Sequence, residues 1–317
     1  MKTSVIIPTY NRRGMVGRAI DSVLRQTGVG TVEVIVVDDG STDGTVQFIQ
    51  ETYKEVRIFE QPHRGAPAAR NCGIRHAKGE FIALLDSDDE LTPKSLAIRA
   101  TLLDQNPDVG WVCCNYDNCI DGEEGFDNYF ERIDLRKILR FEKGRGDLLM
   151  PIDFFGAHLR CSISSTISIM IRREMLRDAL LFQEDLAIGQ DWEFCLRLSH
   201  FCRVGIAFDV VALRHVHKGN LSSNKNLVFS GQVALNKVVM AYPWLTEEQK
   251  SFLKDRTAND LYELAYFELW VNKDRKAAVS ALIKSMMGQM TIPKLKLIIA
   301  CCMPKVLSAN RDACKAK

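Results

Sequence analysis

The chain has 317 residues, of which 46% are hydrophobic and 26% charged, and its formal net charge is +2. This composition belongs to a globular protein with one large core or two smaller ones, and it excludes the disordered and fibrous classes. A net charge of +2 also gives no reason to expect a nucleic-acid partner, because such proteins usually present a strongly basic face.

The sequence predicts neither a membrane span nor disulfide bonds. No run approaches the roughly 18 apolar residues that a spanning helix needs. Pro8 and Asn11 interrupt the short apolar stretch at the N-terminus, which therefore does not resemble a cleavable signal. The ten cysteines are scattered without a CxxC pair, which favours reduced thiols, with a zinc site as the alternative. We expect a cytoplasmic protein.

Short β-branched apolar runs alternate with helical patterns over about the first 115 residues, as in parallel strands joined by crossover helices. The expected strands are Ser4–Pro8, Val32–Asp38, Val56–Glu60, Glu80–Asp86 and Val109–Asn115. The expected helices are Gly14–Gln26, Asp43–Tyr53, Ala66–Ala77 and Pro93–Gln105. This order predicts an α/β fold with a mainly parallel sheet flanked by helices.

The pattern changes after Tyr116. Up to about Phe155 the sequence is polar and charge-mixed, which indicates loops with one helix. The elements expected from there on are a helix at Asp134–Phe141, a strand at Thr166–Ile171, helices at Arg173–Arg177 and Asp191–His200, and strands at Val204–Phe208 and Val211–His215. From about Asn226 the chain is expected to be helical, with breaks at Pro243, Asn272–Asp274, Pro293 and Pro304.

Three polar segments follow expected strands: Pro8-Thr9-Tyr10-Asn11-Arg12, Asp38-Asp39-Gly40-Ser41-Thr42-Asp43 and Asp86-Ser87-Asp88-Asp89. In open parallel sheets, ligands bind at the carboxyl ends of the strands. No G-x-G-x-x-G follows the first strand and no P-loop is present, so a bound diphosphate would need another source of positive charge. A divalent cation held by carboxylates supplies it, which makes the Asp86 segment a candidate metal site.

These aspartates also have an alternative, purely structural interpretation as turn and helix-cap residues. The Asp86 segment would also suit a loop that precedes the helix at Pro93. The segment from Asp38 is rich in turn formers, and Asp43 is able to cap the next helix. A turn there is compatible with a role for Asp39 in binding a base or a ribose hydroxyl.

Five strings, in this order and spacing, resemble the family 2 glycosyltransferases: SVIIPTYNR, EVIVVDDGSTDGT, RGAPAARNCGI, GEFIALLDSDD and GQDWEFCLRL. The resemblance covers about residues 3–220. It implies a GT-A fold (Rossmann-like and nucleotide-binding) over residues 1–222, with a donor half at about 1–115 and an acceptor half at about 116–222. Residues 223–317 would form a C-terminal helical region.

The resemblance also implies roles for individual residues around a nucleotide-diphosphate sugar, with UDP favoured. Residues of the first polar segment (Pro8, Thr9, Tyr10, Asn11, Arg12) would bind the donor, and Asp39 would bond its base. The arginines Arg64 and Arg70 would line the nucleotide or phosphate region, which suits their charge. Asp88 would hold Mg²⁺ or Mn²⁺, and Asp86 or Ser87 would bind the ribose, with Asp86 a possible second ligand.

Asp191 resembles the general base of an inverting transferase, which accepts the proton of the attacking acceptor hydroxyl. Its alternative role is the N-cap of the helix that follows. The preceding residue is Gln190, where many relatives are expected to carry an acid. His215 and His217 lie on one face of a strand end, and of these we favour His217 as a metal ligand over His215. Both are alternatively structural.

The acceptor is expected to be a hydroxyl of a glycan or of a lipid-linked glycan. The processive signature Q-x-x-R-W is absent, which favours transfer of one sugar per encounter. Residues 284–317 carry seven Lys or Arg against one acid, so this tail either contacts the inner face of an anionic membrane or packs on the catalytic domain. The rival functions are a sugar-nucleotide nucleotidyltransferase and a noncatalytic carbohydrate-binding protein.

Overall fold

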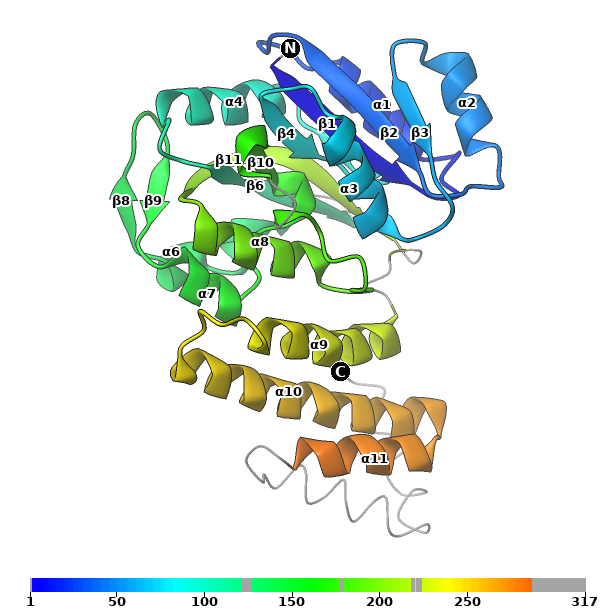
Figure 1. The fold of residues 1–317 in the computed structure, drawn as a ribbon, viewed down its shortest axis with the longest axis vertical. Helices are drawn as coiled ribbons and strands as arrows, with labels where there is room; N and C mark the ends of the chain where they lie inside the picture. Colours follow the sequence, from blue (N-terminus) through cyan, green and yellow to red (C-terminus); the bar gives the residue numbers. More distant parts are fainter. Residues whose placement is uncertain (1, 121–126, 177–179, 218–219, 221–223, 287–317) are drawn as a thin grey trace. The chain divides into compact units, whose positions relative to one another are not determined.

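The computed structural model describes residues 2–120, 127–176, 180–217, 220 and 224–286 (Figure 1). The chain divides into two compact units. The first comprises Met1–Asp185 with Gln190–Lys218, and the second comprises Leu186–Gly189 with Gly219–Lys317.

Among the described residues, the first unit is built on one 11-stranded mixed sheet in the order β3-β2-β1-β4-β10-β6-β11-β9-β8, with β5 beside β11 and β7 beside β6. The strands are β1 (Thr3–Thr9), β2 (Val32–Asp38), β3 (Arg57–Glu60), β4 (Phe81–Leu84), β5 (Glu90–Leu91), β6 (Trp111–Ile120), β7 (Asp127–Asn128), β8 (Phe141–Lys143), β9 (Leu149–Pro151), β10 (Ile169–Arg172) and β11 (Val204–Val216). Strands β1 to β4 pair in parallel, as β6 does with β11, whereas β10 is antiparallel to both β4 and β6. The parallel half places the ends of β1, β2 and β4 at one edge.

The helices of this unit are α1 (Val16–Leu24), α2 (Thr45–Thr52), α3 (Ala66–His76), α4 (Ser95–Gln105), α5 (Tyr129–Arg132), α6 (Leu135–Ile138), α7 (Phe154–Arg160) and α8 (Gln190–Phe201), with 3₁₀ turns at Thr166–Ser168 and Arg173–Met175. Every residue of β1 is buried, as expected for a central strand covered on both faces. Helix α3 packs on β1 and β2. A Cβ on Gly73 would lie 2.4 Å from Ile6 Cγ2, so only glycine permits this close approach.

The expected α/β class is confirmed, but several local expectations are wrong. The two strands expected at Val204–Phe208 and Val211–His215 are one strand, β11, whose pairing with β6 shifts register between Ala207 and Leu213. The helix expected at Asp134–Phe141 ends at Ile138, and Phe141 begins β8. The segment read as loops also contains helices α5 and α7 and strands β7 and β9.

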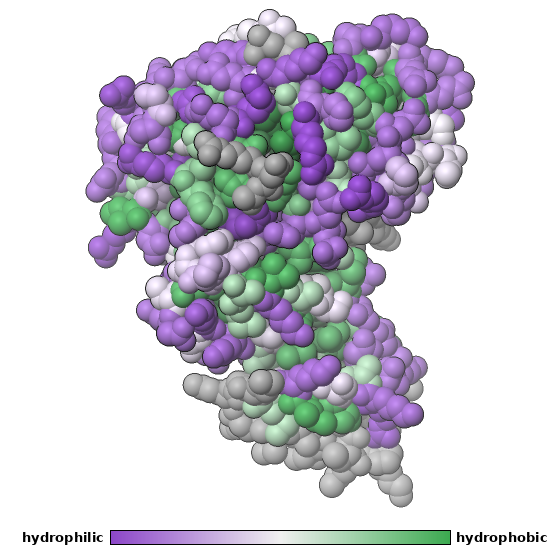
Figure 2. All heavy atoms as spheres, in the orientation of Figure 1, coloured by the Kyte–Doolittle hydropathy of each residue, from purple (hydrophilic) through white to green (hydrophobic). Residues whose placement is uncertain are grey.

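The second unit is helical: α9 (Lys225–Met240), α10 (Glu247–Phe267), a π-helix at Glu268–Asn272 and α11 (Arg275–Ser285). A small core of Leu261, Ala265, Leu269 and Leu282 holds α10 against α11. Hydrophobic side chains also reach the surface of this unit, as Figure 2 shows in green, and Ile283 is 62% exposed. The expected breaks at Pro293 and Pro304 and nearly all of the basic tail lie outside the described residues.

No helix within the described part of the chain is both long enough and apolar enough to cross a membrane.

Candidate functional site

Asp39, just beyond the end of β2, is buried and accepts hydrogen bonds from several groups of its own chain. Its backbone N–H donates to Thr9 O at 2.8 Å, which joins the ends of β1 and β2. Asp39 Oδ1 accepts from Gln61 Nε2 at 2.8 Å and from the backbone N–H of Arg64 at 2.9 Å. Oδ2 accepts from Gly65 N at 2.7 Å and lies 2.8 Å from His63 Nδ1. The carboxylate thus fixes the loop between β3 and α3.

The segment after β1 is held by the loop after β2. Asn11 has a positive φ of 50°, its backbone N–H donates to Ser41 Oγ at 2.8 Å, and its side-chain oxygen accepts from Thr42 N at 2.8 Å. Tyr10 is 43% exposed, and its ring stacks on that of His63 with centroids 4.1 Å apart. Asn11 therefore braces the turn that presents Tyr10.

Two polar atoms at this edge are buried and have no hydrogen-bond partner among the described residues: Thr9 Oγ1, at the end of β1, and Asp38 Oδ1, at the end of β2. The two residues face each other in the parallel register. The other oxygen of Asp38 accepts from the backbone N–H groups of Gly40 and Ser41. Pro8 is buried within β1. This edge therefore keeps acceptor capacity that the fold does not use.

The two predicted arginines have different environments. Arg64 is exposed, and its guanidinium pairs with Glu184 at 2.5 Å. Arg70 is buried on α3 and donates to Asp86 Oδ1 at 2.6 Å and to Gln190 Oε1 at 2.9 Å. Its Nε has no partner among the described residues. Arg70 therefore joins the acidic segment after β4 to the start of α8.

The acidic segment directs its carboxylates to different partners. Asp86 Oδ2 accepts from Thr166 Oγ1 at 3.3 Å, besides the contact of Oδ1 with Arg70. Ser87 is buried. Asp88 Oδ2 lies 3.2 Å from His217 Nε2 and 3.9 Å from Arg12 Nη2. The predicted donor and metal residues Arg12, Asp88 and His217 are thus brought together.

Asp89 holds the end of β11. Its Oδ1 accepts from the backbone N–H of His215 at 2.8 Å. Burial, reinforced by the charges of Asp86 and Asp88, raises the pKa of Asp89 well above the ordinary value of an aspartate. The His215 ring pairs with Glu90 at 2.8 Å, whereas the His217 ring meets Asp88. Of the two histidines, His217 is therefore the one beside the predicted metal ligand.

Asp191 is the second residue of α8, and its Oδ1 accepts from the Trp192 N–H at 2.9 Å. It is therefore in the first turn of the helix and not at the N-cap. Burial raises the pKa of Asp191, the Trp192 N–H and the Arg70 charge lower it, and Asp86 raises it again. A carboxylate with a raised pKa binds a proton more strongly, which suits a general base.

Within the described residues, no three His, Cys, Asp or Glu side chains converge as a complete metal site. Asp88 and His217 form a pair of adjacent ligand types, one oxygen and one nitrogen. Mg²⁺ and related ions are commonly bound through one or two protein ligands together with substrate phosphates and water. The pair therefore fits a cation that arrives with a diphosphate, and it does not fit a closed structural site.

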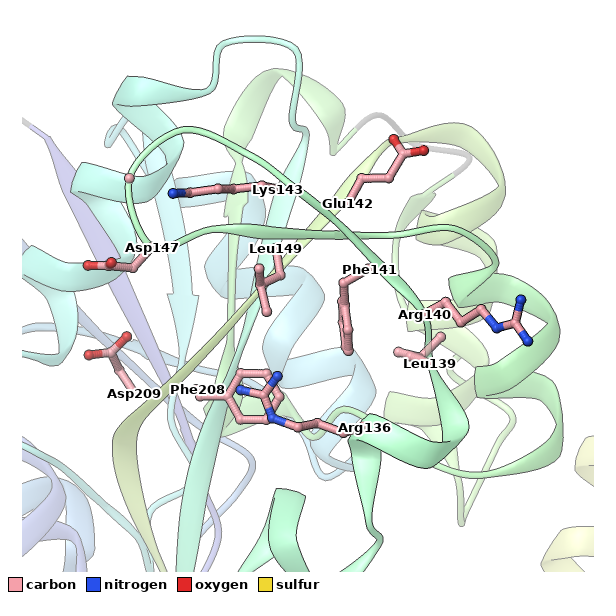
Figure 3. Close-up of a pocket in the computed structure, with 11 residues that line it drawn as sticks. Arg136, Leu139, Arg140, Phe141, Glu142, Lys143, Asp147, Leu149, Phe208 and Asp209 are labelled. Carbon is pink, nitrogen blue, oxygen red and sulfur yellow. The ribbon is translucent and has the colours of Figure 1, made fainter.

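A separate cavity of about 770 Å³ lies between α6, β8, β9 and the middle of β11 (Figure 3). None of the predicted site residues lines it. The guanidinium carbon of Arg136 lies 4.2 Å from the centroid of the Phe208 ring. Figure 3 shows these two side chains together in the cavity. The charged side chains that line the cavity are Arg136, Arg140, Lys143, Glu142, Asp147 and Asp209. Positive and negative charges balance there, so the cavity has no preference for a diphosphate.

The sequence did not predict three residues that contact the site. His63 contacts Tyr10 and Asp39, and Thr166 contacts Asp86. Arg18 Nη2 donates to the backbone oxygen of Asp88 at 2.6 Å. His63 lies within the Gln61–Arg70 stretch, and its nearness to Arg64 was the available signal. No sequence signal indicated Thr166, because the antiparallel pairing of β10 with β4 is what places it beside Asp86.

The chain matches the family model described as Glycosyl transferase family 2 over residues 4–176. An uncharacterized glycosyltransferase of Escherichia coli (strain K12) is 38% identical over 122 residues, which are 37% of this chain and 35% of that relative. The first curated relatives are matched over 15% to 35% of their own lengths.

Two solved structures share the fold. TarS 1-349 of S. aureus in complex with UDP-GlcNAc has a TM-score of 0.63 at 19% identity, covering 90% of this chain and 81% of that one. The mannosyltransferase PcManGT of Pyrobaculum calidifontis, in complex with GDP-Man and Mn2+, has a TM-score of 0.60 at 20% identity, covering 94% and 78%. These similarities confirm the expected GT-A fold.

Proposed function

The chain belongs to glycosyl transferase family 2, and we propose that it transfers one sugar from a nucleotide-diphosphate sugar to a hydroxyl of a glycan or lipid-linked glycan. A UDP-sugar is the favoured donor. The observation that carries the proposal is the bridge made by Arg70, which contacts Asp86 of the acidic segment and Gln190, the neighbour of Asp191. The buried guanidinium of Arg70 thus connects the proposed donor site to the residue next to the proposed base.

The proposed reaction is a single displacement. The acceptor oxygen forms a bond to the anomeric carbon while the bond from that carbon to the diphosphate oxygen breaks. The hydroxyl proton passes to Asp191, whose raised pKa favours its acceptance. Attack from the face opposite the leaving diphosphate inverts the anomeric centre.

We further propose that Asp88 and His217 hold Mg²⁺ or Mn²⁺, with Asp86 as a possible additional ligand. A bound cation would neutralise the negative charge that develops on the departing diphosphate. Arg12, 3.9 Å from Asp88, adds positive charge on the same side. The mannosyltransferase PcManGT, solved in complex with GDP-Man and Mn2+, supports the proposal of such a site on this fold.

Tyr10 and Asp39 are proposed to receive the nucleobase, since they lie together where β1 and β2 end and Tyr10 presents an exposed ring. Asp86 or Ser87 would then meet the ribose. The buried acceptors Thr9 Oγ1 and Asp38 Oδ1 lie at the same edge. They support a polar ligand at this position, because buried acceptors without partners are costly.

The test is donor turnover by the full chain. UDP-, GDP- and dTDP-sugars are supplied separately with Mn²⁺, and release of nucleoside diphosphate is measured with and without excess chelator. We expect release from one donor class and its loss in chelator. Unaltered turnover in chelator would reject the metal role, and formation of a sugar nucleotide from a nucleoside triphosphate would favour the rival nucleotidyltransferase.

A further inference from the structure

His63 makes two contacts that a nucleobase would make at the same place. Its ring stacks on Tyr10 with a centroid separation of 4.1 Å and an interplanar angle of 25°. Its Nδ1 lies 2.8 Å from Asp39 Oδ2 and also makes a hydrogen bond with the backbone oxygen of Asp39 at 3.1 Å. An aromatic stack and a ring nitrogen facing a carboxylate are also what a base with a ring N–H offers.

Asp39 has little remaining capacity for a further donor. Each carboxylate oxygen accepts about two hydrogen bonds, and both oxygens already face two groups each. Two of these groups are the backbone N–H groups of Arg64 and Gly65, and a third is the Gln61 amide. A base that donates to Asp39 must therefore replace one of the four.

His63 is the group best placed to leave. Its side chain is 57% exposed, whereas the Asp39 side chain is 3% exposed. Removing a backbone N–H from Asp39 would require the loop itself to refold, but moving His63 requires only a side-chain rotation into solvent. Rotamer changes of exposed side chains are fast and cost little.

We propose that His63 occupies the nucleobase position in the ligand-free protein and that the donor's base displaces it from Tyr10 and Asp39. This inference rests on the proposed function, because it takes Tyr10 and Asp39 as the base-binding pair. The bases that can replace His63 on a carboxylate are those with a ring N–H: uracil, thymine and guanine. Cytosine and adenine instead present an unprotonated ring nitrogen, which cannot donate to Asp39, so only their exocyclic amino group is left as a donor on that edge.

The need to displace His63 lowers the apparent affinity of the protein for UDP, because only protein molecules in which His63 has left the base position can bind the base directly. Removing the imidazole opens the position in every molecule. His63→Ala is therefore expected to bind UDP roughly three- to tenfold more tightly than the wild type, as for a position open in about 10–30% of molecules. A purely structural histidine would have the opposite effect, since its loss would loosen the loop and weaken binding.

The experiment is calorimetric titration of UDP into the full chain with Mn²⁺, for the wild type, His63→Ala and His76→Ala. His76 is the matched control, because its ring also stacks on an aromatic residue, Phe59, at 4.0 Å, but has Cys72 and not Asp39 as its polar neighbour. We expect tighter binding by His63→Ala and unchanged binding by His76→Ala. Equal or weaker binding by His63→Ala would overturn the displacement.

Two further readouts separate this inference from the function on which it rests. In the wild type, the imidazole NMR signal of His63 should shift on saturation with UDP while that of His76 stays in place, and an unmoved His63 signal would contradict displacement. If UDP, GDP and dTDP all fail to bind both the wild type and His63→Ala, the proposed function fails with the inference. Equal binding by the two proteins contradicts the inference alone.

Discussion

Asp39 and Asp88 both lie just beyond strand ends in the first unit, yet the chain treats their carboxylates differently. Asp39 faces four polar groups of the loop between β3 and α3. Asp88 Oδ2 instead faces His217 at 3.2 Å and Arg12 at 3.9 Å. The imidazole suits a metal cation as partner, and the guanidinium suits a phosphate. In the function we propose, Asp39 therefore primarily shapes the binding surface, whereas Asp88 binds a ligand.

Asp191 extends the comparison to a third carboxylate, which resembles Asp88 more than Asp39. Asp191→Asn keeps the shape and the acceptor for the Trp192 N–H but cannot take up a proton at neutral pH. We expect turnover to fall on the order of 10²–10⁴-fold, with UDP affinity and melting temperature nearly unchanged. Steady-state release of nucleoside diphosphate and UDP titration measure the two quantities. Wild-type turnover in this variant would favour the noncatalytic alternative.

The stability of two matched variants tests the comparison directly. In Asp39→Asn an amide N–H₂ replaces one carboxylate oxygen and faces donors such as the Gly65 N–H, which leaves buried donors unsatisfied. The free energy of unfolding should fall by about 1–3 kcal/mol, measured by urea denaturation without metal.

Asp88→Asn is the control for that measurement. It removes a charge that lies among Asp86 and Asp89, so its free energy of unfolding should change by less than about 0.5 kcal/mol. Equal losses in both variants would remove the distinction between a shaping and a ligand-binding carboxylate.

The ligand-binding side is tested by comparing the two histidines. His217→Ala removes the ring beside Asp88, whereas His215→Ala removes a ring that pairs with Glu90. We expect Mn²⁺-dependent UDP binding to weaken about tenfold in His217→Ala, and much less in His215→Ala. Titrations with and without Mn²⁺ give the metal-dependent part. A larger effect from His215 would move the proposed site away from Asp88.

The parallel half of the sheet could be predicted from the sequence because its information is local. β1 and β2 are apolar runs followed directly by polar turns, and the carboxyl ends of parallel strands meet at one edge. That rule alone brought Thr9, Asp39 and Asp88 to one region. The family resemblance added the roles proposed for Asp88 and Asp191, which no periodicity could supply.

The contacts that define the site could not be predicted, since they depend on tertiary pairing. His217 and Asp88 are in contact although they are 129 residues apart in the sequence. The contact depends on the full length of β11, which continues past Asp209, where the sequence predicted a break between two strands. Its register shifts let β11 continue beside β6. Likewise, the contact of His63 with Asp39 depends on the parallel pairing of β2 with β3, and not on any pattern around His63.

The smallest expected effect concerns Gln190, the position where an acid was expected in many relatives. Gln190 accepts a hydrogen bond from Arg70, and the charge of Arg70 lowers the pKa of Asp191 against the effect of burial. Gln190→Glu places a second carboxylate on Arg70 and next to Asp191. Both changes favour the protonated form of Asp191, so its pKa rises further.

A base must be ionised to work, so activity falls as the pH drops through its pKa, and a higher pKa moves this acidic limb to higher pH. At a pH on the limb, we expect turnover by Gln190→Glu to fall about twofold, as for roughly 0.5 kcal/mol from one partly screened charge, while the plateau above the limb is retained. Gln50→Glu, on the exposed side of α2, adds the same charge away from the site and should leave the profile unchanged. If the acidic limb of the pH profile does not move in Gln190→Glu, a group other than Asp191 accepts the proton. The raised pKa of Asp191 would then be a consequence of burial without a catalytic role.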